Sequence, residues 1–156
     1  MLILQFRMGE DTYALDSRQV VRVLPAARLK RLPAAPAGIA GLLNFEGAPV
    51  PVLDLSELAL GHPAAQHLST RIILTELPGR AGASRLLGLL AEHVTNTLQC
   101  ESADFTPAGI TPPAARYLGP VACLGGMLVQ RIEPERLLTP KVYEALAQDC
   151  ALLGAD

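Results

Sequence analysis

The chain has 156 residues, of which 50% are hydrophobic and 18% are charged, and its net charge is −2. This length suffices for one domain, or one compact pair of subdomains, with a buried core. The slightly negative charge excludes the strong positive field that attracts DNA, RNA or an anionic membrane, so we expect no nucleic-acid partner. The most basic stretch, Arg28, Lys30 and Arg31, lacks the aromatic neighbours that stack on bases and is interpreted as a solvated strand edge.

The first seven residues have no basic lead, no long apolar run and no small-residue cleavage site, which predicts a first strand and not a signal peptide. Elsewhere, charged residues, Pro or Gly interrupt the apolar runs well before the ~18 residues that a membrane helix needs. Cys100, Cys123 and Cys150 are widely spaced, which argues against a disulfide framework and against a thiolate metal site. We therefore expect a cytoplasmic protein in a reducing compartment, without direct membrane insertion.

Short apolar runs separated by turn residues dominate the sequence and indicate an all-β fold. They predict strands over residues 2–8, 12–15, 20–24, 39–45, 48–55, 70–77, 85–91, 94–99 and 127–132. Gly47 is expected at a tight hairpin turn, and Pro49 and Pro51 remove two hydrogen-bond donors from the strand that follows. That strand is therefore expected at a sheet edge or a barrel rim.

Helical signals are few. Asp16 followed by Gln19 resembles a capping box that opens one or two turns, and residues 56–60 are expected to form a short helix ended by a glycine. The strongest signal is C-terminal, where Thr139 can cap a segment that has proline at its first helical position. Apolar residues then recur at three- and four-residue steps, which predicts a C-terminal helix over 139–156 packed on the sheet.

Two segments share a spacing that indicates an internal repeat. Gly47 precedes Asp54 by seven residues, as Gly126 precedes Glu133, and a leucine follows four residues after each acid. Upstream of each segment lies a Val-x-x-x-Leu run that itself follows an acidic residue. This repeated order favours two small barrels over one sandwich, and a chance match in an apolar chain is the alternative.

The local motifs of common catalytic and metal sites are missing. His62, His67 and His93 have no i, i+4 pair and no nearby Cys, so surface or internally bonded histidines are favoured over metal ligands. Phosphate-loop, dinucleotide-binding and nucleophile-elbow motifs are also missing. Asp54 and Glu57 could act as an acid and base pair, but a strand end and a helix start are typical places for capping acids. We expect no enzyme activity, no metal and no cofactor.

Several of these segments together resemble one family, the CheW-like adaptors of bacterial chemotaxis arrays. The resemblance runs nearly end to end, through residues 7–16, 20–24, 32–36, 41–55, 87–94, 127–133 and 137–138. Its most specific part is the pattern formed by Asn44, Gly47, Pro51, Val52, Asp54 and Leu55. It implies a single domain over 1–156, made of two intertwined five-stranded SH3-like β-barrels with short helices and a C-terminal helix. The approximate halves are 12–67 for the first barrel and 1–11 with 68–138 for the second.

The resemblance also implies a function through surfaces, with no catalytic site and no cofactor. In such adaptors the groove of one barrel takes the helical hairpin tip of a methyl-accepting chemotaxis receptor, and the other barrel docks on the regulatory domain of a CheA-type histidine kinase. The positions that match the receptor-side surface are Val20, Arg22, Gly41, Asn44, Glu46 and Thr97. The kinase-side surface is not placed to single residues. The implied location is cytoplasmic, at the inner face of receptor arrays.

Each of these positions also has a structural interpretation. Gly41 and Gly47 bracket an apolar run, so both can be turn and strand residues. Asn44, next to a hairpin, most often bonds local backbone. Val20 belongs either to the core or to a groove.

The sequence departs from the family pattern at two positions. The usual pattern has an acid in Val-x-Glu-Val and an arginine in Asn-Leu-Arg-Gly, where this chain has Arg22 and Glu46. In the family these positions are thought to form a surface ion pair, so a double swap keeps the attraction and inverts the charges shown to a partner. We expect the two residues to face each other across adjacent strands within about 4 Å. The inversion favours a specialised pathway, such as surface sensing of the Wsp type, over the main motility array.

A second class of function stays open beside the adaptor. The chain could be a free-standing relative of the kinase regulatory domain, or a barrel module that binds peptides by adding strands to an open sheet edge. The bound partners distinguish these classes, because an adaptor captures both a receptor and a kinase.

Overall fold

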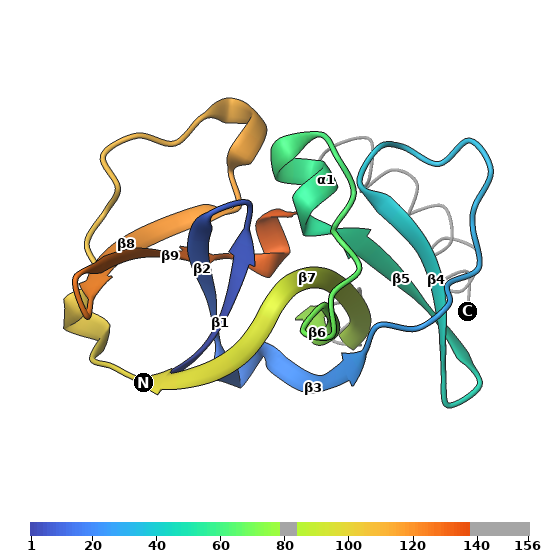
Figure 1. Ribbon diagram of the computed structural model, residues 1–156, viewed down its shortest axis with the longest axis horizontal. Coiled ribbons are helices and arrows are strands. Elements are labelled where there is room, and N and C mark those ends of the chain that lie inside the picture. Colours follow the sequence, from blue (N-terminus) through green and yellow to red (C-terminus); the bar gives the residue numbers. More distant parts are fainter. Residues whose placement is uncertain (79–83, 138–156) are drawn as a thin grey trace.

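The computed structural model describes residues 1–78 and 84–137 and shows a protein built mostly of strands (Figure 1). The strands are β1 (Leu2–Met8), β2 (Asp11–Asp16), β3 (Val20–Pro25), β4 (Ile39–Phe45), β5 (Ala48–Asp54), β6 (Arg71–Pro78), β7 (Ser84–Gln99), β8 (Leu118–Leu124) and β9 (Met127–Ile132). The helical elements are α1 (Leu55–Leu60) and the 3₁₀ turns η1 (Ser17–Gln19), η3 (Ser102–Asp104), η4 (Pro113–Ala115) and η5 (Pro134–Arg136). The expected C-terminal helix over 139–156 lies outside the described residues.

The all-β prediction is confirmed, with two differences in the strands. The runs 85–91 and 94–99, predicted as separate strands, form the single strand β7. Strand β8 was not predicted, because Gly119 and Pro120 lie in it and both residues are typical strand breakers. The ladder between β8 and β9 has a register shift over these two residues, between Leu118 and Val121, which accommodates them.

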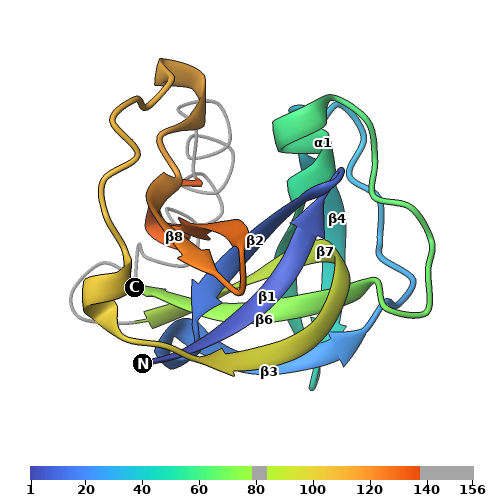
Figure 2. The same ribbon diagram turned by 60° about the vertical axis from the view of Figure 1, so that its left-hand side comes forward.

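Two sheets share β7 (Figures 1 and 2). The first sheet has the neighbour order β3, β6, β7, β5, β4, and the second sheet has the order β8, β9, β2, β1, β7. In both sheets one pairing is parallel, β5 with β7 in the first and β2 with β9 in the second, and the other pairings are antiparallel. The two sheets therefore repeat one arrangement, as the sequence spacing indicated.

Strand β7 changes sheets near its middle. Up to Ala91 it pairs with β6, and from Glu92 onward it pairs with β1. The ladder with β1 shifts register beyond Glu92, and His93 takes a positive φ of 51° at this bulge. A bulge bends a strand and increases its twist, which allows one strand to serve two sheets.

The strand pairing divides the chain differently from the expected halves of 12–67 and 1–11 with 68–138. Strand β2 belongs to the second sheet because it forms a hairpin with β1. Strand β6 and the first half of β7 belong to the first sheet, since they form a hairpin that pairs with β3 and β5. Both differences arise because each antiparallel hairpin stays together in one sheet.

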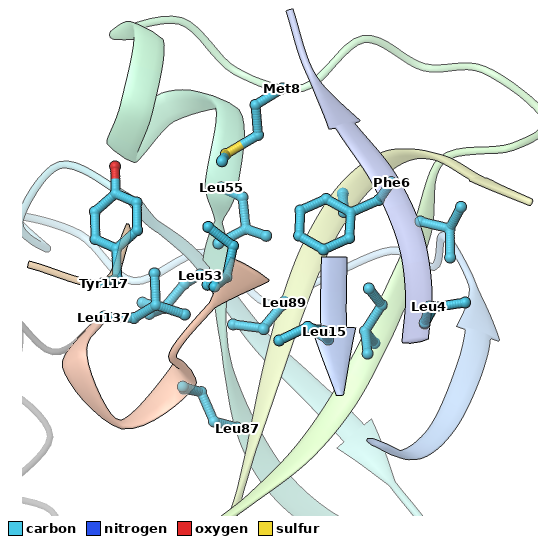
Figure 3. Packing of buried hydrophobic residues seen from close by; sticks show 14 of the residues in the cluster. Leu4, Phe6, Met8, Leu15, Leu53, Leu55, Leu87, Leu89, Tyr117 and Leu137 are labelled. Atoms are coloured by element: carbon cyan, nitrogen blue, oxygen red, sulfur yellow. The ribbon is translucent and has the colours of Figure 1, made fainter. Parts of the chain in front are cut away.

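The largest buried cluster lies between the two sheets and takes side chains from both (Figure 3). Alternate residues of β1 place Leu4, Phe6 and Met8 in it, as period-two alternation requires. The first sheet contributes Leu53 and Leu89 among others. A second cluster lies on the first sheet only, and a third on the second sheet only. The two sheets therefore share a core and form one structural unit.

The hairpin between β4 and β5 turns at Glu46 and Gly47, as expected for Gly47. Both residues have positive φ, 52° and 86°, which is the pattern of a two-residue type I′ turn. The expectation that β5 lies at a sheet edge or a barrel rim holds for its first half only. Its first half, with Pro49 and Pro51, pairs only with β4 in the described ladders, but from Val52 onward it also pairs with β7.

Acidic side chains cap both early helical elements. Asp16 precedes η1, but its carboxylate accepts from the backbone N of Arg18, so the expected box with Gln19 is not the cap that forms. Helix α1 begins after Asp54 and ends at Gly61 in the left-handed region, as predicted. The buried Asp54 carboxylate accepts from Glu57 N at 3.1 Å and from Ala64 N at 2.9 Å. The capping interpretation of Asp54 is thereby confirmed.

We expect Asp54→Ala to lower the free energy of unfolding by about 2 kcal/mol, because it removes the helix cap and leaves buried donors unpaired. Asp54→Asn should fall between this variant and the parent, since an amide has one acceptor oxygen for the two donors. Urea unfolding of the three proteins measures the order. Equal stability of Asp54→Ala and the parent would contradict this role.

The Asp16 carboxylate also accepts from the Arg18 guanidinium, at 2.7 Å from Nη2. This side-chain bond is the main cause that holds the pKa of Asp16 below its ordinary value. A lowered pKa stabilises the folded state above the unfolded-state pKa, and this contribution is lost as pH falls through the folded-state pKa. We expect Arg18→Gln to lower stability near pH 7 and the difference from the parent to shrink below about pH 4. Urea unfolding across pH, with Arg28→Gln as the control for loss of one cation, measures this.

Candidate functional site

The six positions of the expected receptor-side surface lie on two different sheets. Val20 and Arg22 are on β3, which pairs with β6 in the first sheet. Gly41 and Asn44 are on β4, and Glu46 is in the turn that follows. Thr97 is exposed and pairs with Leu4 in the second sheet. The first five positions therefore share one sheet, and Thr97 lies apart from them in the strand pairing.

Arg22 and Glu46 form an exposed ion pair. Arg22 Nη1 lies 3.8 Å from Glu46 Oε1, and the side chains are 56% and 71% exposed. The expected distance is thereby confirmed, but the expected pairing of adjacent strands was wrong. In the described ladders β3 pairs with β6 and β4 with β5, so the tip of the β4–β5 hairpin brings Glu46 to Arg22. The Arg22 guanidinium also lies over the Phe45 ring, 5.4 Å from its centroid.

The hairpin tip is held by Asn44. Its Oδ1 accepts from the backbone N of Gly47 at 2.9 Å, which is the local backbone bond expected for an asparagine beside a turn. The bond fixes the turn that carries Glu46. Asn44 thus positions the charged residue of this surface, while its own side chain is exposed.

Gly41 is buried and has a structural role. A Cβ at this position would lie 2.5 Å from the carbonyl oxygen of Lys30, which no side chain tolerates. Lys30 and Leu42 exchange two backbone hydrogen bonds of 2.9 and 2.8 Å across this close approach. The absence of a side chain at Gly41 therefore lets the segment before β4 pair with the edge of β4. Gly41 itself lies below the surface.

Val20 is partly buried and packs against the largest core cluster, which favours the core interpretation of this residue. Its sequence neighbour Val21 was not singled out from the sequence, yet this residue is 50% exposed. An exposed valine beside an exposed ion pair is an apolar contact point at a protein surface. Strict alternation would place Val21 and Arg22 on opposite faces, so the register shift of β3 at this point, where both residues are exposed, could not be predicted from the sequence.

A hollow of about 1400 Å³ borders this region. It is lined by the segment before β4, by one face of the β4–β5 hairpin including Asn44, and by the loop after α1, where Asp54 holds the Ala64 backbone. The basic residues Arg28, Lys30 and Arg31 are exposed and line it. The acids Asp54 and Glu57 line it as well, so the hollow has apolar, basic and acidic side chains in its walls.

The structure also brings together three residues that no local spacing joined. His67 lies in the loop after α1, while Glu92 and His93 lie where β7 changes sheets. One ligand atom from each of the three lies within 4.8 Å of the others. The group could not be found from the sequence, because 24 residues lie between His67 and Glu92.

We expect weak coupling between Arg22 and Glu46 in a double-mutant cycle of Arg22→Gln and Glu46→Gln, below about 1 kcal/mol, because both side chains are exposed. Arg22→Gln alone should cost more than Glu46→Gln, since it also removes the contact with Phe45. Thermal and urea unfolding measure the cycle, with Arg28→Gln as the unpaired control. Strict additivity would show that the ion pair contributes nothing to the folded state.

Comparison with known proteins gives one consistent result. A family model described as the CheW-like domain matches residues 2–141. The chain is 28% identical over 148 residues to the chemotaxis protein CheW of Rhizobium meliloti (strain 1021), covering 92% of this chain and 90% of that protein. It is 31% identical over 122 residues to protein FrzA of Myxococcus xanthus, covering 77% and 73%. No helix among the described residues is long and apolar enough to span a membrane.

The fold is similar to a solved structure, that of the scaffolding protein TtCheW from Thermoanaerobacter tengcongensis. The TM-score is 0.77 at 22% sequence identity, and the match covers 90% of this chain and 89% of that one. The predicted fold of two SH3-like subdomains is thereby confirmed. Because the family model spans nearly the whole sequence, this chain belongs to the CheW-like domain family.

Proposed function

We propose that this chain is a non-catalytic adaptor that couples a methyl-accepting chemotaxis receptor to a CheA-type histidine kinase. The observation that carries the proposal is the family match over residues 2–141. Relatives over most of the chain are named as chemotaxis proteins, and the similar solved structure is that of a scaffolding protein. An adaptor with these partners acts in the cytoplasm, at the inner face of receptor arrays.

The proposal of a role without catalysis rests on the family match, and each buried polar side chain of the described residues has a structural bond. Asp16 and Asp54 cap helical turns. Ser56 donates to Glu92, Thr70 donates to Ala65 O, and Thr75 donates to Leu87 O. These bonds show that the buried polar side chains are satisfied within the fold.

The receptor side is proposed to be the surface around Arg22, Glu46 and Val21, with Asn44 and Gly41 as positioning residues. The two charges are exposed and the valine is half exposed, so all three can contact a partner. An exposed valine next in sequence to one member of an exposed ion pair suits a helical hairpin that offers an apolar side chain and a matching pair of charges. Thr97 lies on the other sheet and is proposed as a separate signalling position.

The inverted order of Arg22 and Glu46 is proposed to select the receptor. Like charges that face each other across an interface cost several kcal/mol, whereas the exposed pair itself contributes ~0–1 kcal/mol to folding. The inversion therefore matters more for recognition than for stability. This favours a specialised pathway, such as surface sensing of the Wsp type.

We expect the protein to raise the activity of its cognate kinase only when the receptor is also present, because an adaptor bridges the two. Reconstitution of receptor, kinase and adaptor, with phosphorylation as the readout, tests this. Glu46→Arg should lower the melting temperature only slightly, but it should weaken receptor binding strongly. The double variant Arg22→Glu with Glu46→Arg should stay weak, since the displayed order of charges is reversed again.

Three outcomes contradict the proposal. Stimulation of the kinase without a receptor would indicate a free-standing regulatory domain. Capture of one peptide-bearing protein, with neither receptor nor kinase, would indicate a peptide-binding module that uses an open sheet edge. Full receptor affinity in the double variant would show that the charge order does not select the partner.

A further inference from the structure

Two histidines and a glutamate meet where β7 passes from the first sheet to the second. His67 Nε2 lies 3.5 Å from Glu92 Oε1, and the rings of His67 and His93 are 5.1 Å apart between centroids. One ligand atom from each of the three residues lies within 4.8 Å of the other two. His67 comes from the loop after α1, so the group joins two separate segments of the chain.

These distances are close to those of a three-ligand metal site. Zinc binds His nitrogen at about 2.0–2.1 Å and carboxylate oxygen at about 2.0–2.2 Å, which places tetrahedral ligand atoms ~3.4 Å apart. The distance between His67 Nε2 and Glu92 Oε1 already matches this value. The ligand atom of His93 lies within 4.8 Å of the other two, so metal binding would require its side chain to turn toward them. Two histidines and one glutamate form a known ligand set for Zn²⁺ that leaves a fourth position open.

The ligands have partners of the kind that orient metal ligands. Ser56 Oγ donates to Glu92 Oε2 at 3.1 Å, which leaves Oε1 toward His67. Ser69 Oγ lies 3.4 Å from His93 Nδ1, so the other ring nitrogen of His93 remains available. Outer-shell bonds of this kind fix the orientation of ligands and are costly to remove.

The backbone around the group is also held in place. In the loop, His67 N donates to Thr70 Oγ1 at 3.2 Å, and Thr70 N donates to His67 O at 3.1 Å. Val94 N donates to Ser69 O at 2.9 Å, which ties this loop to β7 beside the bulge. His93 has a φ of 51° at the bulge where β7 changes sheets, so this bend carries the residue that lies beside Ser69 of the loop.

We propose that His67, Glu92 and His93 form a binding site for a divalent transition metal ion, with Zn²⁺ as the best fit. The His67 side chain is 48% exposed and the Glu92 side chain 12%, so the site is open to solvent on the loop side. Water, or a side chain from a partner, would take the fourth position. Bound metal would clamp the loop to the bend of β7 and hold Gln66, which lines the adjacent hollow. This inference does not depend on the proposed adaptor function.

The test is a titration of tag-free, EDTA-dialysed protein with Zn²⁺ alone, followed by calorimetry and thermal unfolding. We expect one Zn²⁺ per chain and a higher melting temperature with metal. His67→Ala and His93→Ala should each weaken binding by roughly 100-fold or more, and Ser56→Ala by about 10-fold. His62→Ala is the matched control, because His62 lies outside the group and its Nδ1 is 3.3 Å from Pro63 O. This variant should bind Zn²⁺ as tightly as the parent does.

Substitution of the exposed His67 should leave the fold intact, so His67→Gln provides a second variant if His93→Ala unfolds. Co²⁺ in place of Zn²⁺ should give the visible absorption of a tetrahedral site in the parent and in His62→Ala, but not in His67→Gln. Equal Zn²⁺ affinity of parent and His67→Gln would overturn the proposal. So would an equal loss in His62→Ala, or binding of less than one ion per chain at saturation. In those cases His67 and Glu92 form a side-chain contact without a metal role.

Discussion

The fold depends on one long strand that pairs in two sheets. Strand β7 pairs with β6 and β5 in its first half and with β1 in its second half. A flat strand could not do this, so the bulge around His93 is a requirement of the architecture. Because both sheets hydrogen-bond to the same strand and share the largest buried cluster, neither is expected to unfold alone. A surface on one sheet is thereby held rigidly relative to a surface on the other.

The two sheets repeat the same neighbour order, and the repeat explains the spacing seen in the sequence. Gly47 and Gly126 both lie in hairpin turns with positive φ, and Asp54 and Glu133 are both the residues before a short helical element. The second strand of each hairpin then pairs in parallel with a strand of its own sheet. A common arrangement therefore places a hairpin tip on each sheet, and the charged tip of the first sheet carries Glu46.

The region around that tip is organised by small structural residues. Asn44 holds the turn, Gly41 admits the segment that pairs with β4, and Asp54 links α1 to the loop beyond it. None of these residues needs to touch a partner to affect recognition. Loss of any of them would displace exposed side chains or the walls of the hollow. The same loop carries His67, so the metal site that we propose would act on a wall of the hollow and not on the ion pair.

The sequence alone was sufficient for the all-β class, most strand positions, the turn at Gly47, the helix after Asp54 and the family resemblance. These features are local, because they depend on alternation, turn residues and caps within a few positions. The sequence also predicted that Arg22 and Glu46 lie within about 4 Å of each other. The basis was that both residues depart from the family pattern with opposite charges, and the strand pairing expected for them was wrong. The outward position of Val21 and the burial of Gly41 could not be derived, since both depend on which strands become neighbours.

Only the tertiary structure decided the joining of the two runs of β7, the division of the chain between the sheets and the group of His67, Glu92 and His93. Each of these depends on contacts between residues far apart in the chain. Such contacts arise when buried surfaces of different hairpins pack together, and no spacing within one segment records them. A hydrophobic pattern predicts which side chains become buried, but the contacts of those side chains depend on the whole tertiary structure.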